Sequence, residues 1–268
     1  MSIEPDDVTS ILRLLSPERL KALTELTGSN AAAIELHQET LRLGSALMHV
    51  TATIEIGLRN TVCENLTQHF GVPNWLTQTP IHFQWRDAER NNIQKALDSA
   101  KRAEYSKMSQ AAKGALDPLA YPNGRPANTA HLKRSKDRRR LIDVSEGKVI
   151  AELTLYFWKR LYGPDYEQSL WRTTLKRTFP HKALKRADIA TRLEQIYQSR
   201  NRLAHHEPVL HKRFHDTVTP IDFVVQNLGA HTPGNTTPLA RLLEDDLIEV
   251  KARADALHDR LKIYRKAL

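Results

Sequence analysis

The residues best suited to chemistry lie in one stretch, SRNRLAHHEPVL, which runs from Ser199 to Leu210. An arginine can donate two parallel hydrogen bonds to a phosphate group, and a histidine can exchange a proton near neutral pH. Arg200, Asn201 and His205 together could therefore hold a phosphate group and transfer a proton beside it.

Arg200 falls on a face of the predicted helix where a hydrophobic residue is expected. That face carries Ile189, Leu193, Ile196 and Leu203. A guanidinium on a core-facing stripe needs an anion or an acceptor, because an unpaired buried charge is very costly. Two interpretations follow: an internal salt bridge, for instance to Glu55, or an arginine that lines a cleft and meets a substrate phosphate.

The two histidines of the stretch each have a polar neighbour one helical turn earlier. Asn201 lies four residues before His205, and Arg202 lies four residues before His206, so each pair shares a helix face. Proline disfavours continuation of a helix, so Pro208 predicts a helix end nearby and places His205 at a solvated rim.

The spacing of an arginine and a histidine five residues apart is weak evidence by itself. This composition should produce roughly one such match by chance. Arg253 and His258 do form a second one, but no polar residue follows that arginine and the pair lies in the terminal helix. We assign it to the surface or to packing.

The charge of the chain indicates an anionic partner. The 268 residues carry a formal net charge of +9, with a pI near 9.6. Lysine and arginine contacts to phosphates dominate non-specific nucleic-acid affinity, so nucleic acid is the leading partner class, although a basic surface can also serve solubility alone.

Basic residues are densest in HLKRSKDRRR, which lies within a turn-rich region, 114–146, predicted to be a loop or a partly ordered arm. The candidate RNA-binding residues are Lys133, Arg134, Lys136, Arg138, Arg139 and Arg140. The alternative for this stretch is a solvated charged face, since no aromatic residue is interleaved to stack bases.

The composition predicts a mostly helical protein, because helix-forming residues dominate and Gly and Pro together number only 23. Ser16 reads as the N-cap of a short helix, and a long helix is expected from about residue 30 to 70. Near the end of the chain, apolar residues repeat in alternating steps of four and three from Leu243 to Leu268. This seam favours packing within a helical bundle over pairing between subunits.

Other classes of protein are disfavoured by the sequence. No run of about 18 apolar residues indicates a membrane anchor, and the acidic start lacks the apolar stretch of a signal peptide. Cys63 is the only cysteine and has no intrachain disulfide partner. A cytoplasmic location is therefore expected.

Several segments together resemble one known family. SRNRLAHHEPV is similar to the signature of the abortive-infection (Abi-like) branch of HEPN proteins, which has an arginine, a polar residue, three variable residues and a histidine. The resemblance extends to ATIEIGLRNTVCENL at Ala52–Leu66, FGVPNWL at Phe70–Leu76, GKVIAELTLYFWKRLYG at Gly147–Gly163 and the following SLWRTTLKRTFP. It covers nearly the whole chain, and 114–146 matches least.

The resemblance implies an all-α fold, a HEPN-type helical bundle with additional helices, and a metal-independent endoribonuclease that needs no cofactor. Family members are typically toxins of antiphage defence, act as dimers with two motifs across one cleft, and can be neutralised by a protein or RNA antitoxin. By this resemblance Arg200 and His205 are catalytic and Asn201 assists them. The implied products are a 2′,3′-cyclic phosphate and a 5′-hydroxyl.

The resemblance does not decide which further residues support catalysis; Arg202, His206, Arg59 and Asn60 are candidates. His206 fits a looser variant of the motif, but His205 is preferred because Asn201 is its helical neighbour. Arg59 and Asn60 belong to the amino-terminal signature, although a structural pair between Glu55 and Arg59 is the stronger interpretation there.

Three segments follow from this reading: a helical part over 1–113, the basic loop or arm over 114–146, and a helical part with the motif over 147–268. They are expected to form one continuous domain. Two other functions stay open, a non-enzymatic RNA-binding or scaffold protein and a metal-dependent hydrolase. The latter would use His205, His206, His211 and His215, which lie within eleven residues.

Overall fold

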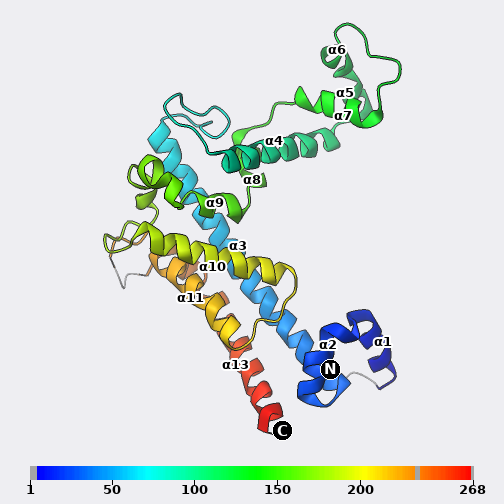
Figure 1. Cartoon of the computed structure of the whole chain (residues 1–268), viewed down its shortest axis with the longest axis vertical. Helices are drawn as coiled ribbons and strands as arrows, with labels where there is room; N and C mark the ends of the chain where they lie inside the picture. The colour runs from blue at the N-terminus through cyan, green and yellow to red at the C-terminus, as the bar shows by residue number, and fades with distance from the viewer. Residues whose placement is uncertain (1–4, 233–235, 267–268) are drawn as a thin grey trace. The chain divides into compact units, whose positions relative to one another are not determined.

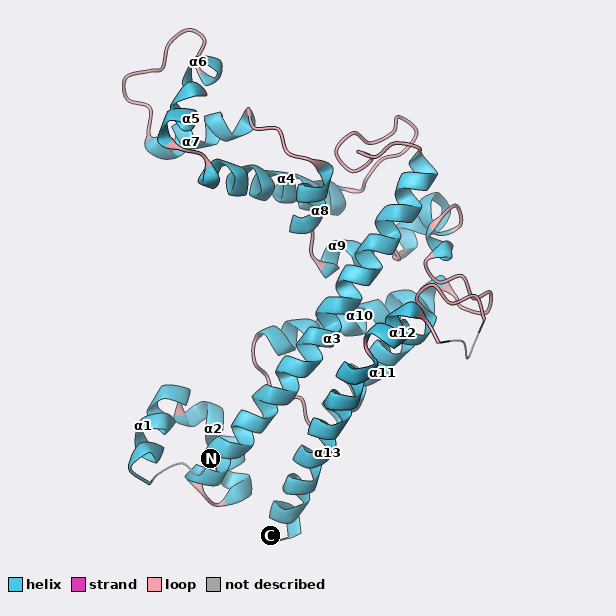
Figure 2. Cartoon of the chain, turned by 180° about the vertical axis from the view of Figure 1, so that it is seen from behind, coloured by secondary structure: helices cyan, strands magenta, loops and turns pink. Residues whose placement is uncertain are grey.

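The computed structural model describes residues 5–232 and 236–266, and within these ranges the chain is helical with no β-strand (Figures 1 and 2). The α-helices are α1 (Pro5–Leu15), α2 (Pro17–Thr27), α3 (Asn30–Phe70), α4 (Asp87–Lys107), α5 (Gln110–Ala115), α6 (Asp117–Ala120), α7 (His131–Arg140), α8 (Glu146–Glu152), α9 (Leu155–Arg160), α10 (Arg186–Ala204), α11 (Lys212–Asn227), α12 (Pro238–Leu242) and α13 (Glu244–Lys266). Two short 3₁₀ segments, η1 (Pro164–Tyr166) and η3 (Leu175–Arg177), flank a π-helical turn, η2 (Glu167–Trp171). The predicted all-α class is confirmed.

The chain divides into two compact units that are interleaved along the sequence. Unit 1 comprises Met1–Thr61, Tyr162–Pro164 and Lys176–Leu268, and unit 2 comprises Val62–Leu161 and Asp165–Leu175. These units do not coincide with the three consecutive segments expected from the sequence, because helices that are distant in sequence share a unit.

Helix α3 has the long apolar stripe that its four-residue spacing predicts. The stripe residues Val50, Ile54, Leu58, Val62 and Leu66 are at most 1% exposed. The helix ends at Gly71, whose positive φ of 69° suits a glycine, and whose amide donates to the carbonyl of Thr67. The predicted long helix and its end are confirmed.

In unit 1, α13 packs along the amino-terminal half of α3 in the opposite direction. Arg260 of α13 pairs with Glu35 and Glu39 of α3, and His49 of α3 lies 3.5 Å from Asp246. The seam residues Leu243, Val250, Ala254, Leu257 and Leu261 are buried. The seam therefore packs within the chain as predicted; Leu268 lies outside the described residues.

Helices α10 and α11 form the other closely packed pair of unit 1, as both views show (Figures 1 and 2). Ser199 and Thr217 bring their hydroxyl groups within 3.3 Å across this pair, and the Arg192 guanidinium lies over the ring of Phe223. The last turn of α10 also meets α3, where Leu203 packs beside Gly44. The motif helix is thus held on two sides.

Unit 2 has an aromatic core and one buried carboxylate. Its ring contacts join Phe70, Trp75, Phe83, Trp85, Phe157 and Tyr166. Beside them the fully buried Glu89 of α4 accepts from Arg160 and from the Tyr166 hydroxyl, at 2.7 Å for the tyrosine. These hydrogen bonds stabilise the buried carboxylate of Glu89, which would strongly destabilise the fold if it had no partner.

The basic stretch differs from its prediction as a loop or partly ordered arm, because residues 131–140 form helix α7. Two of its arginines are anchored: Arg134 and Arg138 both bind the carboxylate of Asp117, with Arg138 Nε at 2.6 Å. Lysine and arginine are good helix formers once their repulsion is offset, and this ion-pair cluster offsets it. Hydrogen bonds from the two arginines hold the pKa of Asp117 far below its usual range.

Candidate functional site

The motif residues lie at the carboxyl-terminal end of α10, on the stripe that the sequence predicts. Ile189, Leu193, Ile196 and Leu203 are buried, and Arg200 between them is half-buried. The side chain of Asn201 is also half-buried, whereas His205 is exposed. The three residues therefore lie near one helix end, from Arg200 in α10 to the cap residue His205, with the histidine toward solvent.

A regular helix-terminating motif fixes the backbone around the histidines. The amide of Glu207 donates to the carbonyl of Arg202 at 3.1 Å, and the amide of His206 donates to the carbonyl of Leu203 at 3.0 Å. This pair of bonds is the Schellman arrangement, in which the residue after the cap adopts left-handed backbone angles. His206 occupies that position with φ 57°, and His205 is the cap residue.

Arg200 has no partner of its own in the part of the chain that the structure describes: no hydrogen bond or ion pair reaches its side chain. The internal salt bridge with Glu55 is therefore not formed there. The comparable pair at the end of the chain behaves differently, because Arg253 binds Glu249 through Nε at 2.8 Å and Nη2 at 2.5 Å. Arg200 keeps its guanidinium available for an anion, and Arg253 does not.

Asn201, Arg202 and His205 likewise make no side-chain hydrogen bond to any described residue. Their polar atoms are free for a ligand or for water. Near the helix end Glu207 lies 3.8 Å from Arg213, which is the nearest described ion pair to the motif in sequence.

Arg19 is a neighbour of the motif that the sequence reasoning missed. It lies in α2 and its Nη1 donates to the carbonyl of His206 at 3.4 Å, across 187 residues of sequence. The carbonyl of His206, in the left-handed turn, accepts this hydrogen bond. No local pattern around Arg19 signals it, because only the packing of α2 against the end of α10 brings the two together.

His37 of α3 is a second residue whose importance the sequence pattern does not indicate. Its side chain is 1% exposed, and its Nδ1 has no hydrogen-bond partner among the described residues. Burial, together with the positive charge of Arg19, lowers the pKa of His37 below its usual value. The imidazole is therefore held neutral beside the arginine that contacts the motif turn.

Arg59 and Asn60 are not brought to the motif by any described contact. Leu203 packs beside Gly44, and Arg59 lies 15 residues further along α3, which corresponds to roughly 22 Å of helix rise. The predicted pair between Glu55 and Arg59 is also not formed among the described residues. Instead, the Arg59 Nε donates to Asn60 Oδ1 at 3.5 Å.

The histidines after the motif do not gather around one point. His211 stacks on His258 of α13 with ring centroids 5.5 Å apart, while His215 lies near Thr219. Within residues 5–232 and 236–266, no group of three or more His, Cys, Asp or Glu side chains could hold a metal ion. In the same ranges no helix is long and apolar enough to cross a bilayer.

The six candidate RNA-binding residues divide into two sets in the structure. Arg134 and Arg138 are occupied by Asp117, and Arg138 is only 7% exposed, so these two act in folding. Lys133, Lys136, Arg139 and Arg140 keep access to solvent.

Comparison of the chain with protein-family models, with curated proteins and with solved structures gives no match. The resemblance to Abi-like HEPN proteins therefore rests on the sequence segments quoted above. The fold adds an all-helical architecture and a motif placed at one helix end.

The left-handed turn predicts that His206→Gly stabilises the protein. An L-residue in this conformation costs about 1–2 kcal/mol, whereas glycine loses about 0.5–1 kcal/mol through its larger unfolded-state entropy. The free energy of unfolding, measured by urea titration, should rise by up to about 1 kcal/mol. His205→Gly, at a cap residue with φ −91°, is the matched control and should give no gain. A loss of stability in His206→Gly would contradict the turn geometry.

The buried His37 predicts a dependence of stability on pH. As the pH falls through about 6.5, the unfolded chain binds a proton at this residue while the folded chain does not. The free energy of unfolding should therefore decrease on acidification from about pH 7.5, at a rate of at most about 1.4 kcal/mol per pH unit for this one group.

The measurement compares the unfolding free energy of the wild type with that of His37→Gln across this range. The variant should lose part of the pH dependence, whatever its stability at one pH. His131→Gln alters an exposed histidine and should retain the wild-type slope. Equal slopes for the wild type and His37→Gln would show that His37 is not held neutral.

Proposed function

We propose that the protein is a metal-independent endoribonuclease whose active site is formed by Arg200, Asn201 and His205. The single observation that carries the proposal is the half-buried Arg200 on an apolar stripe, five residues before the exposed His205 and without a described anionic partner. A guanidinium that is partly removed from water gains stability when an anion pairs with it.

The chemistry follows from the residue types. The 2′-hydroxyl of the RNA is the nucleophile, so no serine or cysteine nucleophile is required and DNA is not cleaved. His205 accepts the proton of this hydroxyl as its oxygen bonds to phosphorus, and Arg200 stabilises the charge on the five-coordinate phosphorus. The bond to the 5′-oxygen breaks, and a proton from an acid completes a 5′-hydroxyl and leaves a 2′,3′-cyclic phosphate.

Asn201 has two possible contributions within this site. Its amide can donate to a phosphate oxygen, or it can orient the imidazole one turn later on the same helix face. His205 is favoured over His206 because Asn201 lies four residues before His205 on the same helix face.

The active form is proposed to be a homodimer. One motif supplies one preferred histidine, whereas cleavage uses both a base and an acid. Two copies of the end of α10 related by a two-fold axis would provide both, since a two-fold interface presents the same surface from each subunit.

The resemblance to Abi-like HEPN proteins suggests a biological setting for this activity. Within the proposal, the protein is a cytoplasmic toxin or effector of bacterial antiphage abortive infection, and a protein or RNA antitoxin is its natural inhibitor. The HEPN-type bundle belongs to the same proposal, supported by the all-helical fold and the ordered sequence segments.

The active-site assignment predicts loss of cleavage in Arg200→Ala and in His205→Ala. Loss of general acid–base catalysis costs about 10²–10⁴ in rate, and loss of transition-state charge stabilisation costs about 10²–10³. The assay incubates purified protein with total RNA in excess EDTA and maps the product ends. Wild type should cleave under these conditions and leave cyclic phosphate ends.

Arg253→Ala and His258→Ala form the matched control pair, because they have the same five-residue spacing but lie in α13. Both should retain cleavage, as should His206→Gly. Wild-type rates in Arg200→Ala and His205→Ala with unchanged helical circular dichroism would refute the site. Loss only in His206 variants would move the catalytic role to that histidine.

The proposed dimer predicts that specific activity falls when wild-type protein is diluted below its dimer dissociation constant. The reason is that each cleft then lacks its second histidine. Light scattering over the same concentrations identifies the oligomeric state. A monomer that cleaves RNA with constant specific activity over a wide dilution range would exclude the composite cleft and leave the ribonuclease assignment intact.

A further inference from the structure

A basic groove lies in unit 2 between α4 and α7, outside the motif. Its volume is about 590 Å³. The charged residues that line it are Asp98, Lys101 and Arg102 of α4 and Lys136, Arg139 and Arg140 of α7. Five cations therefore converge on a space that has one carboxylate.

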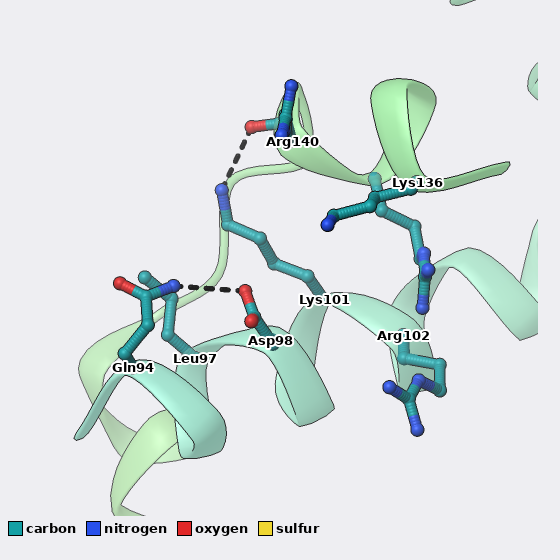
Figure 3. Close-up of a pocket in the computed structure, with 8 residues that line it drawn as sticks. Gln94, Leu97, Asp98, Lys101, Arg102, Lys136 and Arg140 are labelled. Atoms are coloured by element: carbon teal, nitrogen blue, oxygen red, sulfur yellow. Dashed lines mark hydrogen bonds between the residues drawn. The ribbon is translucent and has the colours of Figure 1, made fainter. Parts of the chain in front are cut away.

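That carboxylate does not neutralise the groove. Asp98 accepts a hydrogen bond from the Gln94 amide at 3.0 Å and makes no ion pair with a described cation (Figure 3). Arg140 pairs with Asp137 at 3.4 Å, whereas Lys101, Arg102, Lys136 and Arg139 make no ion pair with a described carboxylate. Like charges that converge without enough counter-charge repel one another, so an anion in the groove would be stabilised.

One of the five cations has a structural role. Lys101 Nζ donates to the carbonyl of Arg140 at 2.9 Å, which reaches from α4 to the carboxyl-terminal end of α7 (Figure 3). A cation suits the negative end of a helix dipole. This bond links the two walls of the groove.

The two faces of α7 divide its cations between folding and the groove. Arg134 and Arg138 are four residues apart and bind Asp117, whereas Lys136 follows Arg134 by about 200° of helix rotation. The groove-lining cations of α7 therefore lie on the face opposite the ion-pair cluster. The cluster of Arg134, Arg138 and Asp117 anchors the helix and makes no ion pair with the groove-lining cations.

Two groove cations are not engaged at all. Arg102 and Lys136 are exposed, and neither makes a hydrogen bond or an ion pair with a residue that the structure describes. Figure 3 shows them on the two walls, Arg102 from α4 and Lys136 from α7. They are available for anionic groups at separate points along the groove.

We infer that this groove binds the phosphodiester backbone of RNA, at a site distinct from the motif of α10. The choice of RNA rests on the proposed ribonuclease function; the anionic chemistry of the ligand rests on the groove itself. A run of phosphates can contact cations on both walls, whereas one inorganic phosphate fills a small part of the space. No aromatic residue lines the groove, so bases are not stacked and binding tolerates different sequences.

The test measures the salt dependence of binding to a labelled single-stranded 2′-O-methyl RNA, which lacks the nucleophile for cleavage. The double variant Arg102→Gln/Lys136→Gln removes the two unengaged cations and leaves Lys101 and the Asp117 cluster intact. Each phosphate contact contributes about 0.7 to the slope of log affinity against log salt, so the variant's slope should be shallower by about 1.4. From about 50 to about 200 mM salt, its affinity should then fall roughly sevenfold less than that of wild type.

Arg125→Gln/Lys182→Gln is the matched control, since it also removes one arginine and one lysine. Both residues are exposed, lie outside the groove, and make no described hydrogen bond or ion pair. The control should keep the wild-type slope, and circular dichroism should show both variants folded. A wild-type slope in Arg102→Gln/Lys136→Gln, or an equal change in the control, would overturn the groove assignment.

The design separates this inference from the ribonuclease proposal. Binding of non-cleavable RNA requires no catalysis, so failure of cleavage in EDTA with a shallower slope in the groove variant would refute only the enzyme. Conversely, cleavage that depends on Arg200 and His205 with an unchanged slope would refute only the groove. Displacement of the RNA by equimolar inorganic phosphate would also overturn the backbone assignment, because a single anion would then fill the site.

Discussion

Burial of the apolar stripe of α3 is the constraint on which the remaining structure depends. A helix of 41 residues spans roughly 60 Å, and its buried leucines, isoleucines and valines must be covered along that length. In unit 1 this cover comes from α10, α11, α12 and α13, as Leu203 beside Gly44 and Leu228 and Leu239 beside Gly57 illustrate. The position of the motif turn follows from this covering of α3.

The arginines of this protein fall into two groups, those that form ion pairs within the chain and those that do not. Arg138 is bound to Asp117, Arg160 to the buried Glu89 and Arg260 to two glutamates of α3. These ion pairs tie helices that are far apart in sequence. Arg200 and Arg102 lack such carboxylates, so their guanidinium groups are available to an external anion.

Periodicity and capping signals predicted α2, α3, α10 and α13, because these signals reflect a local property. Four-residue steps of apolar residues identified α3, the alternating steps identified α13, and Ser16 with its proline identified the start of α2, where its hydroxyl accepts from the Arg19 amide at 3.4 Å. The same reasoning mistook residues 131–140 for a loop or arm. Charge density gives no sign of the Asp117 contact that stabilises a helix there.

The sequence by itself determined the all-helical class, the stripe that carries Arg200 and the proximity of Asn201 to His205, because residues within one helical turn are placed by backbone geometry alone. Only the tertiary structure decided that Arg200 has no described ion pair, that Arg19 meets the carbonyl of His206, and that α4 and α7 face one another across a basic groove. These features depend on contacts between segments separated by tens to hundreds of residues. Their formation depends on how whole helix faces pack, which no local pattern specifies.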